Sequence, residues 1–272
     1  MASPRRAALG VLLLALGAFA AWELSRLLVV YQELRTVASR LPELPALERV
    51  THRREPRFPV KVWVHRVDSI ERAVLMARKF AGMELDVVFD TAAGSFDVGH
   101  PPVPSAGISL DALFGAVPDV GRHYFWVDFK NLTDANAPAA CRSLLATAAK
   151  YGLVGRMIVE SPNPQALSCF TAGGLYTSYY LFPDVGPASM TEGQLASYYE
   201  EVKRNLAASD VNAVSSSYQS LPFIEAYLPG SDALIWYLEH DSGWRRRAVL
   251  AYLGRKPDVR VILIRQLSRG YR

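Results

Sequence analysis

The sequence predicts an α/β protein built as a (β/α)8 barrel of the TIM type and preceded by an N-terminal hydrophobic helix. From residue 60 onward, short apolar runs alternate with helix-like stretches, which indicates parallel strands joined by right-handed crossovers. About eight such units in roughly 210 residues suit one closed barrel. The sequence has no glycine-rich nucleotide-binding loop, which disfavours an open doubly wound sheet.

The expected strands are the short apolar runs, which lie at 60–64, 83–89, 96–99, 124–129, 156–159, 175–181, 211–215, 233–238 and 259–264. Helix-like stretches lie between most of them, at 69–80, 109–116, 135–151, 163–171, 191–206, 218–227 and 243–253. The first of these begins at Ser69 and continues with apolar residues at helical spacing, as an amphipathic helix does. Nine strand candidates exceed the eight of a barrel, so one is expected to be an extra strand. The run 259–264 is the first suspect.

Residues 1–22 are expected to form a signal peptide or a signal anchor. Arg5-Arg6 precedes an almost uninterrupted apolar run, 7–22, and this order is typical of export signals. The sequence Ala18-Phe19-Ala20 would permit cleavage, whereas the apolar residues that follow would suit an uncleaved anchor. The two arginines keep the N-terminus in the cytoplasm. The rest of the chain is therefore expected to be exported, either membrane-anchored through the N-terminus or secreted/periplasmic.

Two further segments complete the predicted organisation. Residues 23–59 are charged and contain several X-Pro steps, so they are expected to form a helix and a linker. Residues 60–272 are expected to form the barrel. In the whole chain 50% of the residues are hydrophobic and 21% are charged, which is enough apolar material for a full core and argues against disorder.

Charge and cysteine content exclude some classes of function. The net charge of +4 and the pI of about 9.1 are mild, and the folded part has no long basic block, so no nucleic acid partner is expected. The two cysteines, Cys141 and Cys169, do not form a CxxC pair, so a zinc site built on them is not expected. Two buried thiols are favoured over a disulfide, which the sequence leaves open because it does not give the distance between them.

Polar side chains end or follow several of the strand candidates, where a barrel places its chemistry. Glu84 and Asp86 are two residues apart in one strand and therefore share a face. Asp128 and Lys130 repeat this spacing at the end of the fourth candidate. The candidate site residues, in chain order, are His65, Arg66, Glu84, Asp86, His100, Asp128, Lys130, Glu160 and Trp236.

The three acids Glu84, Asp86 and Asp128 indicate a metal site. Burying two carboxylates in an apolar strand costs free energy unless a cation accompanies them. Hard divalent cations prefer carboxylate oxygens, so Mg²⁺ or Ca²⁺ is the expected cofactor. The alternative is a structural ion pair.

The histidines are expected to be catalytic, because two imidazoles can move protons to and from a phosphodiester. A single histidine would more often belong to a core, but His65 and His100 end consecutive strand candidates. Lys130 is expected to pair with an acid, to contact substrate, or both. Arg66 is expected either to bind phosphate with two hydrogen bonds or to face solvent. The glycosylation sequon Asn131-Leu132-Thr133 lies at the expected mouth of the barrel and is attributed to chance.

The order His65-Arg66, Glu84-x-Asp86, His100 and Asp128-x-Lys130 resembles the glycerophosphodiester phosphodiesterase-like superfamily, which includes the sphingomyelinase D-type phospholipases and the menorin-like proteins. The resemblance covers about residues 61–165 and implies a (β/α)8 barrel. It implies that the two histidines are an acid/base pair and that the three acids bind Mg²⁺ or Ca²⁺. It also implies that Lys130 stabilises the phosphate and that Trp236 is an aromatic near the site.

The chain departs from typical glycerophosphodiesterases at two positions. Val67 stands where they have glycine after His-Arg, and Pro101-Pro102 stands where they have aspartate after the second histidine. His100-Pro101-Pro102 and the later Asp-Phe-Lys-Asn are more similar to the menorin-like branch, so the substrate is left open.

The sequence therefore predicts a metal-dependent phosphodiesterase that acts on a glycerophosphodiester or a phospholipid-like diester by two-histidine acid/base catalysis. Arg66, Lys130, Glu160 and Trp236 are expected to bind the substrate. The expected partners are a small-molecule or lipid phosphodiester and the membrane. The alternative from another class is a non-catalytic extracellular menorin-like binding module that keeps the barrel. A sugar hydrolase using Glu84 and Glu160 is a weaker alternative, because it leaves both histidines without a role.

Overall fold

The computed structural model describes residues 4–47, 58–239 and 243–266. Within these residues, eight parallel strands close into a barrel in the order β1-β9-β8-β7-β6-β5-β4-β2, and β1 pairs with β2. The strands are β1 (Val62–Val64), β2 (Gly82–Asp90), β4 (Tyr124–Phe129), β5 (Met157–Ser161), β6 (Tyr176–Tyr180), β7 (Ala213–Ser217), β8 (Asp232–Tyr237) and β9 (Val259–Ile264). The predicted (β/α)8 fold is confirmed.

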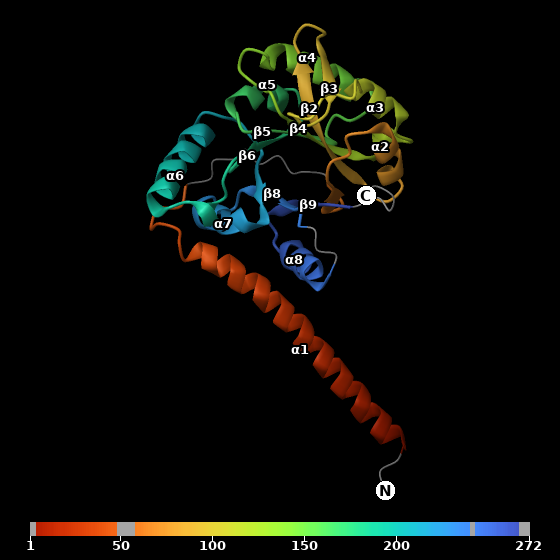
Figure 1. Ribbon diagram of the computed structural model, residues 1–272, viewed down its shortest axis with the longest axis vertical. Coiled ribbons are helices and arrows are strands. Elements are labelled where there is room, and N and C mark those ends of the chain that lie inside the picture. Colours follow the sequence, from red (N-terminus) through yellow and green to blue (C-terminus); the bar gives the residue numbers. More distant parts are fainter. Residues whose placement is uncertain (1–3, 48–57, 240–242, 267–272) are drawn as a thin grey trace.

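Helices surround the strands in the described part of the chain (Figure 1). They are α2 (Ile70–Ala77), α3 (Leu110–Ala116), α4 (Ala137–Lys150), α5 (Ser168–Ala172), α6 (Glu192–Ala207), α7 (Leu221–Tyr227) and α8 (Trp244–Gly254). Helix α2 begins where the sequence indicates, because the Ser69 side chain accepts a hydrogen bond from the Arg72 backbone N–H at 3.2 Å. An N-cap of this kind satisfies a donor that the first helical turn leaves unused.

The extra strand is β3 (Ser95–Val98), not the suspected run 259–264. Strand β3 turns back and pairs antiparallel with β2, from Val87 to Asp90. The run Val259–Ile264 is β9, which pairs parallel with both β8 and β1 and closes the barrel. The prediction was wrong because an apolar strand has the same local pattern whether its neighbours run parallel or antiparallel.

The half of the barrel interior at the amino ends of the strands is filled with apolar side chains. They belong to one cluster of inward-facing residues, which includes Trp63, Tyr124, Trp126, Ile158, Tyr176, Leu234 and Leu263. Phe58 packs beneath them, and its ring makes edge contacts with Trp63, Tyr124 and Tyr176 at 5.2–5.8 Å between centroids. Tyr124 and Tyr176 begin their strands, so this floor lies at the amino ends and the polar residues lie at the opposite end.

Helix α1 (Pro4–Ala38) projects from the barrel as one long rod, with the N-terminus at its far end (Figure 1). Its C-terminal part packs against α7 and α8 and buries Val30, Leu34 and Val37. Among the described residues, the stretch Leu14–Ala38 is long and apolar enough to cross a membrane, with a mean hydropathy of 1.4. The predicted N-terminal hydrophobic helix is therefore present. Residues 48–57 of the predicted linker lie outside the described residues.

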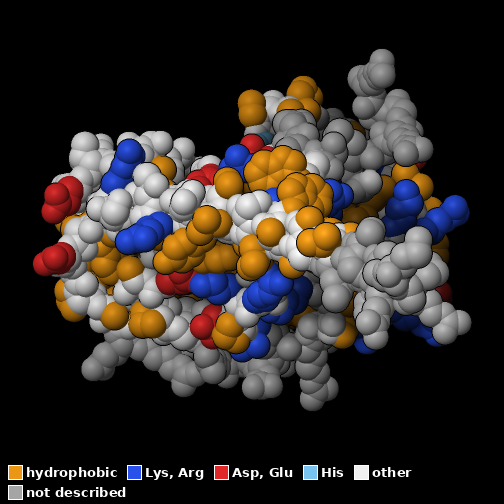
Figure 2. Space-filling view, turned by 90° about the horizontal axis from the view of Figure 1, so that it is seen from below, with side chains coloured by type: hydrophobic (Ala, Val, Ile, Leu, Met, Phe, Trp, Pro, Cys, Tyr) orange, Lys and Arg blue, Asp and Glu red, His pale blue; other side chains and the backbone are white. Residues whose placement is uncertain are grey.

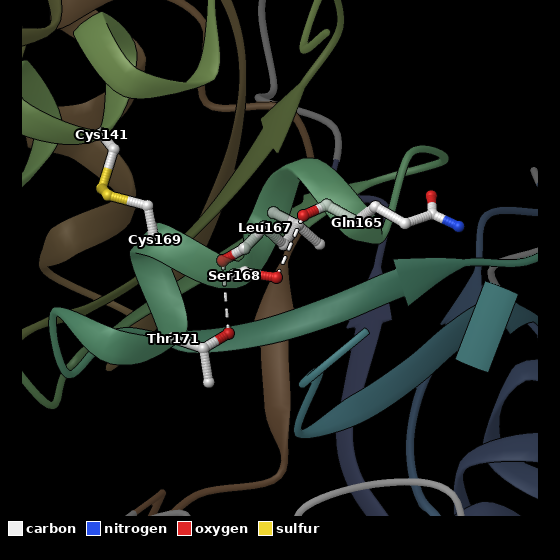
Figure 3. Close-up of a disulfide and its surroundings, with 6 residues drawn as sticks. All are labelled: Cys141, Gln165, Leu167, Ser168, Cys169 and Thr171. Carbon is white, nitrogen blue, oxygen red and sulfur yellow. Dashed lines mark hydrogen bonds between the residues drawn. A yellow bond between two sulfur atoms is a disulfide. The ribbon is translucent and has the colours of Figure 1, made fainter. Parts of the chain in front are cut away.

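A disulfide joins Cys141 of α4 to Cys169 of α5 (Figure 3). The preference for two buried thiols was wrong, because the two helices bring the Cα atoms within 6.2 Å of each other, inside the range that a disulfide can bridge. Cys141 is fully buried, whereas Cys169 is exposed. The short helix α5 is further held by side-chain hydroxyl bonds from Ser168 and Thr171 to backbone carbonyls of the preceding turn.

Candidate active site

The centre of the site is a group of three buried carboxylates at the open end of the barrel. Glu84 and Asp86 come from β2 and Asp128 comes from β4, where it lies directly beside Asp86 in the parallel register. A ligand oxygen from each residue lies within 4.8 Å of those of the other two. Glu84 and Asp86 are each only 2% exposed. The structure thus brings the three predicted metal ligands together.

Lys130 partly balances this negative charge. Its Nζ lies 2.8 Å from Asp86 Oδ1 and also donates a hydrogen bond to Asp128 Oδ2. Burial alone would lower the pKa of Lys130, but the two carboxylates raise it, so the ammonium stays charged. Lys130 therefore pairs with acids, which was one of its two expected roles.

One ammonium does not neutralise three carboxylates. Burial, followed by repulsion from Asp86 and Asp128, raises the pKa of Glu84 well above its usual value. Burial also raises the pKa of Asp128 to about 6, even though Lys130 opposes the change. A group of acids that resists ionisation in this way gains stability from a further positive charge.

The carboxylate group fits a divalent cation. Asp86 Oδ2 and Asp128 Oδ1 are buried and have no hydrogen-bond partner among the described residues. Buried polar atoms are normally satisfied, so two such oxygens in one cluster indicate that something else binds there. Oxygen atoms from three carboxylates are the ligand set that Mg²⁺ and Ca²⁺ prefer.

His65 and Arg66 follow β1 directly and border the carboxylates. His65 Nε2 lies 3.8 Å from Glu84 Oε2, and its side chain is 16% exposed. Arg66 takes a left-handed backbone conformation, with φ of 62°, and this turn directs its backbone N–H to Glu84 Oε2 at 2.6 Å. A positive φ in a residue other than glycine is uncommon and marks a constrained site.

Burial controls the protonation of His65. It lowers the pKa of the imidazole to about 4, because loss of solvation outweighs the attraction of Asp86. The positive charges of Arg265, Arg66 and Lys130 act in the same direction as burial. His65 is therefore neutral at pH 7.

His100 reaches the site from a loop. The expectation that it ends a barrel strand was wrong, because it follows the antiparallel strand β3. Gly99 beside it donates a backbone hydrogen bond to Asp86 O at 2.9 Å, and a charge on His100 lowers the pKa of Asp128. Its ring Nδ1 lies 2.6 Å from Pro101 O, and the Pro101-Pro102 peptide is cis. The two histidines thus approach the carboxylates from different loops.

Glu160 lies on β5, the strand next to β4, and Trp236 lies on β8, three strands further round the barrel. Glu160 sits beside Asp128 in the parallel register of β4 and β5. Burial and then the charge of Asp128 raise its pKa well above the usual value, and its Oε2 has no hydrogen-bond partner among the described residues. Trp236 of β8 contacts Tyr180 of β6 edge to face, at 5.0 Å between ring centroids.

Several site residues were not predicted. Asp68 accepts a hydrogen bond from the Asp86 backbone N–H at 3.1 Å and lies 3.2 Å from Arg66 Nε. Arg72 donates to the backbone oxygens of Arg66 at 2.6 Å and His65 at 3.1 Å, which fixes the loop that carries both. The available signal was their position just after the His-Arg pair. It was overlooked because Arg72 also fits the polar face of α2.

Asn131 of the sequon has a structural role. Its side-chain oxygen accepts from the Phe89 backbone N–H at 2.9 Å, and its side-chain nitrogen donates to Phe89 O at 3.0 Å. These bonds replace ladder bonds between the ends of β4 and β2.

Comparison with solved structures finds glycerophosphodiester phosphodiesterases. The chain superposes on such an enzyme from Parabacteroides distasonis with a TM-score of 0.50 and 14% identity, covering 75% of this chain and 91% of that one. It superposes on a phosphodiesterase from Oleispira antarctica, solved with the product sn-glycerol-3-phosphate, with a TM-score of 0.50 and 11% identity, covering 75% and 92%. Comparisons with protein-family models and with curated proteins find no match. The shared feature is the barrel fold.

Proposed function

We propose that this chain is a metal-dependent phosphodiesterase that cleaves a glycerophosphodiester or a phospholipid-like diester at the open end of its barrel. The observation that carries the proposal is the convergence of three buried carboxylates, two of them with unsatisfied oxygens, beside His65 and Lys130. The barrel is the fold of the glycerophosphodiesterases that it resembles in structure. The pattern His100-Pro101-Pro102 favours the menorin-like branch of that superfamily.

Glu84, Asp86 and Asp128 would hold Mg²⁺ or Ca²⁺, which when bound would neutralise the phosphate and polarise its oxygens. One of His65 and His100 accepts the proton of the attacking oxygen, which belongs to water or to a hydroxyl of the substrate. The other donates a proton to the leaving oxygen. His65 suits the accepting part, since its imidazole is neutral and donation would require the protonated imidazolium.

The remaining residues position the substrate. Lys130 and Arg66 supply positive charge around the phosphate, and Arg72 and Asp68 hold the loop that carries Arg66. Glu160 on β5 and Trp236 on β8 would contact the alcohol portion of the substrate. We also propose that the protein is exported. The N-terminal apolar helix and the disulfide support this, because disulfides persist in oxidising compartments.

The test is turnover by the full-length protein after treatment with a chelator. We expect no cleavage of a glycerophosphodiester or of a generic aryl diester without metal, and recovery when Mg²⁺ or Ca²⁺ is added. Asp128→Asn should abolish the recovery and weaken cation binding measured by calorimetry. The matched control is Asp111→Asn, because Asp111 is an exposed acid on α3 that pairs with Lys150.

Three outcomes separate the candidate functions. Cation-dependent turnover supports the phosphodiesterase. Cation binding without turnover of any diester would instead favour the non-catalytic binding module. If Asp128→Asn keeps both cation binding and turnover, the assignment of the three acids as metal ligands is contradicted.

A further inference from the structure

Helix α1 runs along the rim of the barrel mouth. The Arg26 guanidinium lies 5.8 Å from the ring centroid of Trp244, the first residue of α8. Further along α1, Arg40 donates to Ala188 O at 3.1 Å, in the connection that follows β6. Both connections leave the carboxyl ends of barrel strands, where the candidate site opens. Between them, Glu33 bonds to the second residue of α8.

Several hydrogen bonds make up the contact between Glu33 and α8. Arg245 donates to both Glu33 oxygens at 2.9–3.0 Å and to the Tyr218 hydroxyl at 2.7 Å. Tyr218 in turn donates to Glu33. Tyr218 directly follows β7, so this contact is also on the mouth side. Because these contacts hold α1 against the mouth side of the barrel, the direction of α1 determines which way the mouth faces.

The N-terminal part of α1 has the length and pattern of a membrane span. From Arg6 to Arg26 the helix rises about 30 Å, which is the thickness of the hydrocarbon core. Leu14, Leu16 and Phe19 are exposed, and helical spacing puts Leu14 on the side opposite Leu16 and Phe19. A helix that is apolar on all sides is buried in protein or in lipid, and these side chains are not covered by the described part of the chain. The outer boundary of the span then falls near Arg26.

The start of α8 lies at that same boundary. Trp244 is 41% exposed beside Arg26, and Arg247 is exposed one turn further. Viewed from below, the side from which α1 projects, hydrophobic side chains gather beside Lys and Arg side chains (Figure 2). Tryptophan prefers the membrane interface, and arginine is attracted to anionic head groups.

We propose that the start of α8 is a lipid-binding surface: Trp244 and Arg247 rest on the outer face of the bilayer that α1 crosses, with Trp22 beside them. The partner is an anionic lipid surface, because the exposed charge here is arginine and the adjoining helix is apolar on all sides. This surface also indicates the substrate class, an inference that rests on the proposed phosphodiesterase function. The diester is carried by a membrane lipid and enters the mouth from the bilayer.

The first experiment locates the two ends of α8 relative to lipid. Cys141 and Cys169 are bonded to each other, so one added cysteine is the single free thiol of the chain. Full-length Trp244→Cys and Arg255→Cys proteins are labelled with an environment-sensitive fluorophore. They are then reconstituted in phosphatidylcholine vesicles with and without phosphatidylglycerol. Arg255 is an exposed residue at the opposite end of α8.

We expect a head-group quencher lipid to quench the label at position 244 and not the label at 255, and more strongly in the anionic vesicles. Equal quenching at both positions, or at neither, would overturn the lipid surface. Disulfide cross-linking of two unlabelled Trp244→Cys proteins to each other, without quenching of the label by lipid, would mean that protein covers this face instead, and would also overturn it.

The second experiment separates this surface from the catalytic proposal. Arg247→Glu should lower turnover of a lipid diester in anionic vesicles at least about fivefold and leave turnover of a soluble glycerophosphodiester unchanged. Arg255→Glu should change neither. An equal loss on both substrates, or no loss on vesicles, contradicts the lipid substrate class. If no diester is cleaved by the unaltered protein, the proposed function fails, while the quenching result still decides the surface.

Discussion

His65 stands beside three carboxylates and is nevertheless neutral at pH 7. An imidazole next to an acid usually gains a proton. Here burial outweighs the charge of Asp86 and lowers the pKa of His65 to about 4. Lys130 and Arg66 contribute in the same direction, so the cations that accompany the acids also keep the imidazole uncharged. In the proposed reaction, the neutral imidazole of His65 would accept a proton at physiological pH.

Replacing either histidine tests this role. We expect His65→Ala and His100→Ala to lower turnover by roughly 10²–10⁴-fold, the usual contribution of general acid–base catalysis. The double variant should lose much less than the product of the two single losses, because both residues act in one step. Steady-state kinetics on a soluble diester measure this, with circular dichroism as the control for folding. Full activity in both single variants would exclude the catalytic pair.

Without a divalent cation, the protein should become less stable as the pH rises from about 4 to about 7. Burial, above all, raises the folded-state pKa of Glu84, Asp68 and Asp128, the last two to about 6. A raised carboxyl pKa contributes stability at low pH that is lost as the pH rises through the folded value. His65, with its lowered pKa, acts in the opposite direction, but these three acids, together with Glu160, whose pKa burial also raises, outweigh it.

Urea unfolding in the presence of a chelator measures this dependence. Asp128→Asn should make the decline shallower, and a saturating divalent cation should raise stability most near pH 7, where the carboxylates are ionised. A metal-free protein that gains stability steadily from pH 4 to pH 7 would show that the three carboxyls ionise without cost.

Among the elements, the sequence predicted those whose signal is local. The Tyr124–Phe129 strand and the helices on either side of it are predicted directly by apolar runs and by the polar residues that bound them. The partners of a strand are not local, so the antiparallel pairing of β3 and the barrel closure by β9 were missed. The same limit applies in the site. The spacing of Glu84 and Asp86 put both on one face, but no spacing could show that His100 returns on a loop.

The disulfide is another contact between distant residues that the local sequence did not reveal, and it leads to a prediction about stability. Cys141 and Cys169 are 28 residues apart, so their bond restricts a loop whose closure is worth about 3–4 kcal/mol in the unfolded chain. We expect the double variant Cys141→Ser/Cys169→Ser to lose stability of this order in denaturant unfolding. A reductant should destabilise the unaltered protein similarly and leave the variant unchanged. Equal stability with and without reductant would mean that the bond does not form.

At the scale of the whole molecule, α1 would set the position of the barrel relative to a membrane. Its buried Val30, Leu34 and Val37 pack on the barrel, and its apolar N-terminal part extends beyond it. In the proposed arrangement, this one continuous helix would join the membrane to the rim of the site. Cleavage after Ala20 would leave the packed part in place but remove the span.

We expect the leader to be retained. Full-length protein expressed from the intact gene should fractionate with membranes, resist extraction by high salt, and keep residues 1–20 by intact mass. Salt removes proteins held by surface charge but not those held by a spanning helix. Recovery of a soluble exported protein beginning at Ala21 would establish a cleaved signal peptide instead. Recovery from the cytoplasm would contradict export.

The aromatic side chains beneath the site close one end of the barrel interior. Phe58 and the rings above it close the amino end, so whatever enters at the mouth must leave by backing out. A lipid would therefore insert only its head group, while its acyl chains stay in the leaflet from which it came. Under the proposed function, the water-soluble fragment and the lipid fragment would separate at the mouth after cleavage. The lipid product would then return to the same leaflet, so the reaction would alter that leaflet alone without moving lipid across the bilayer.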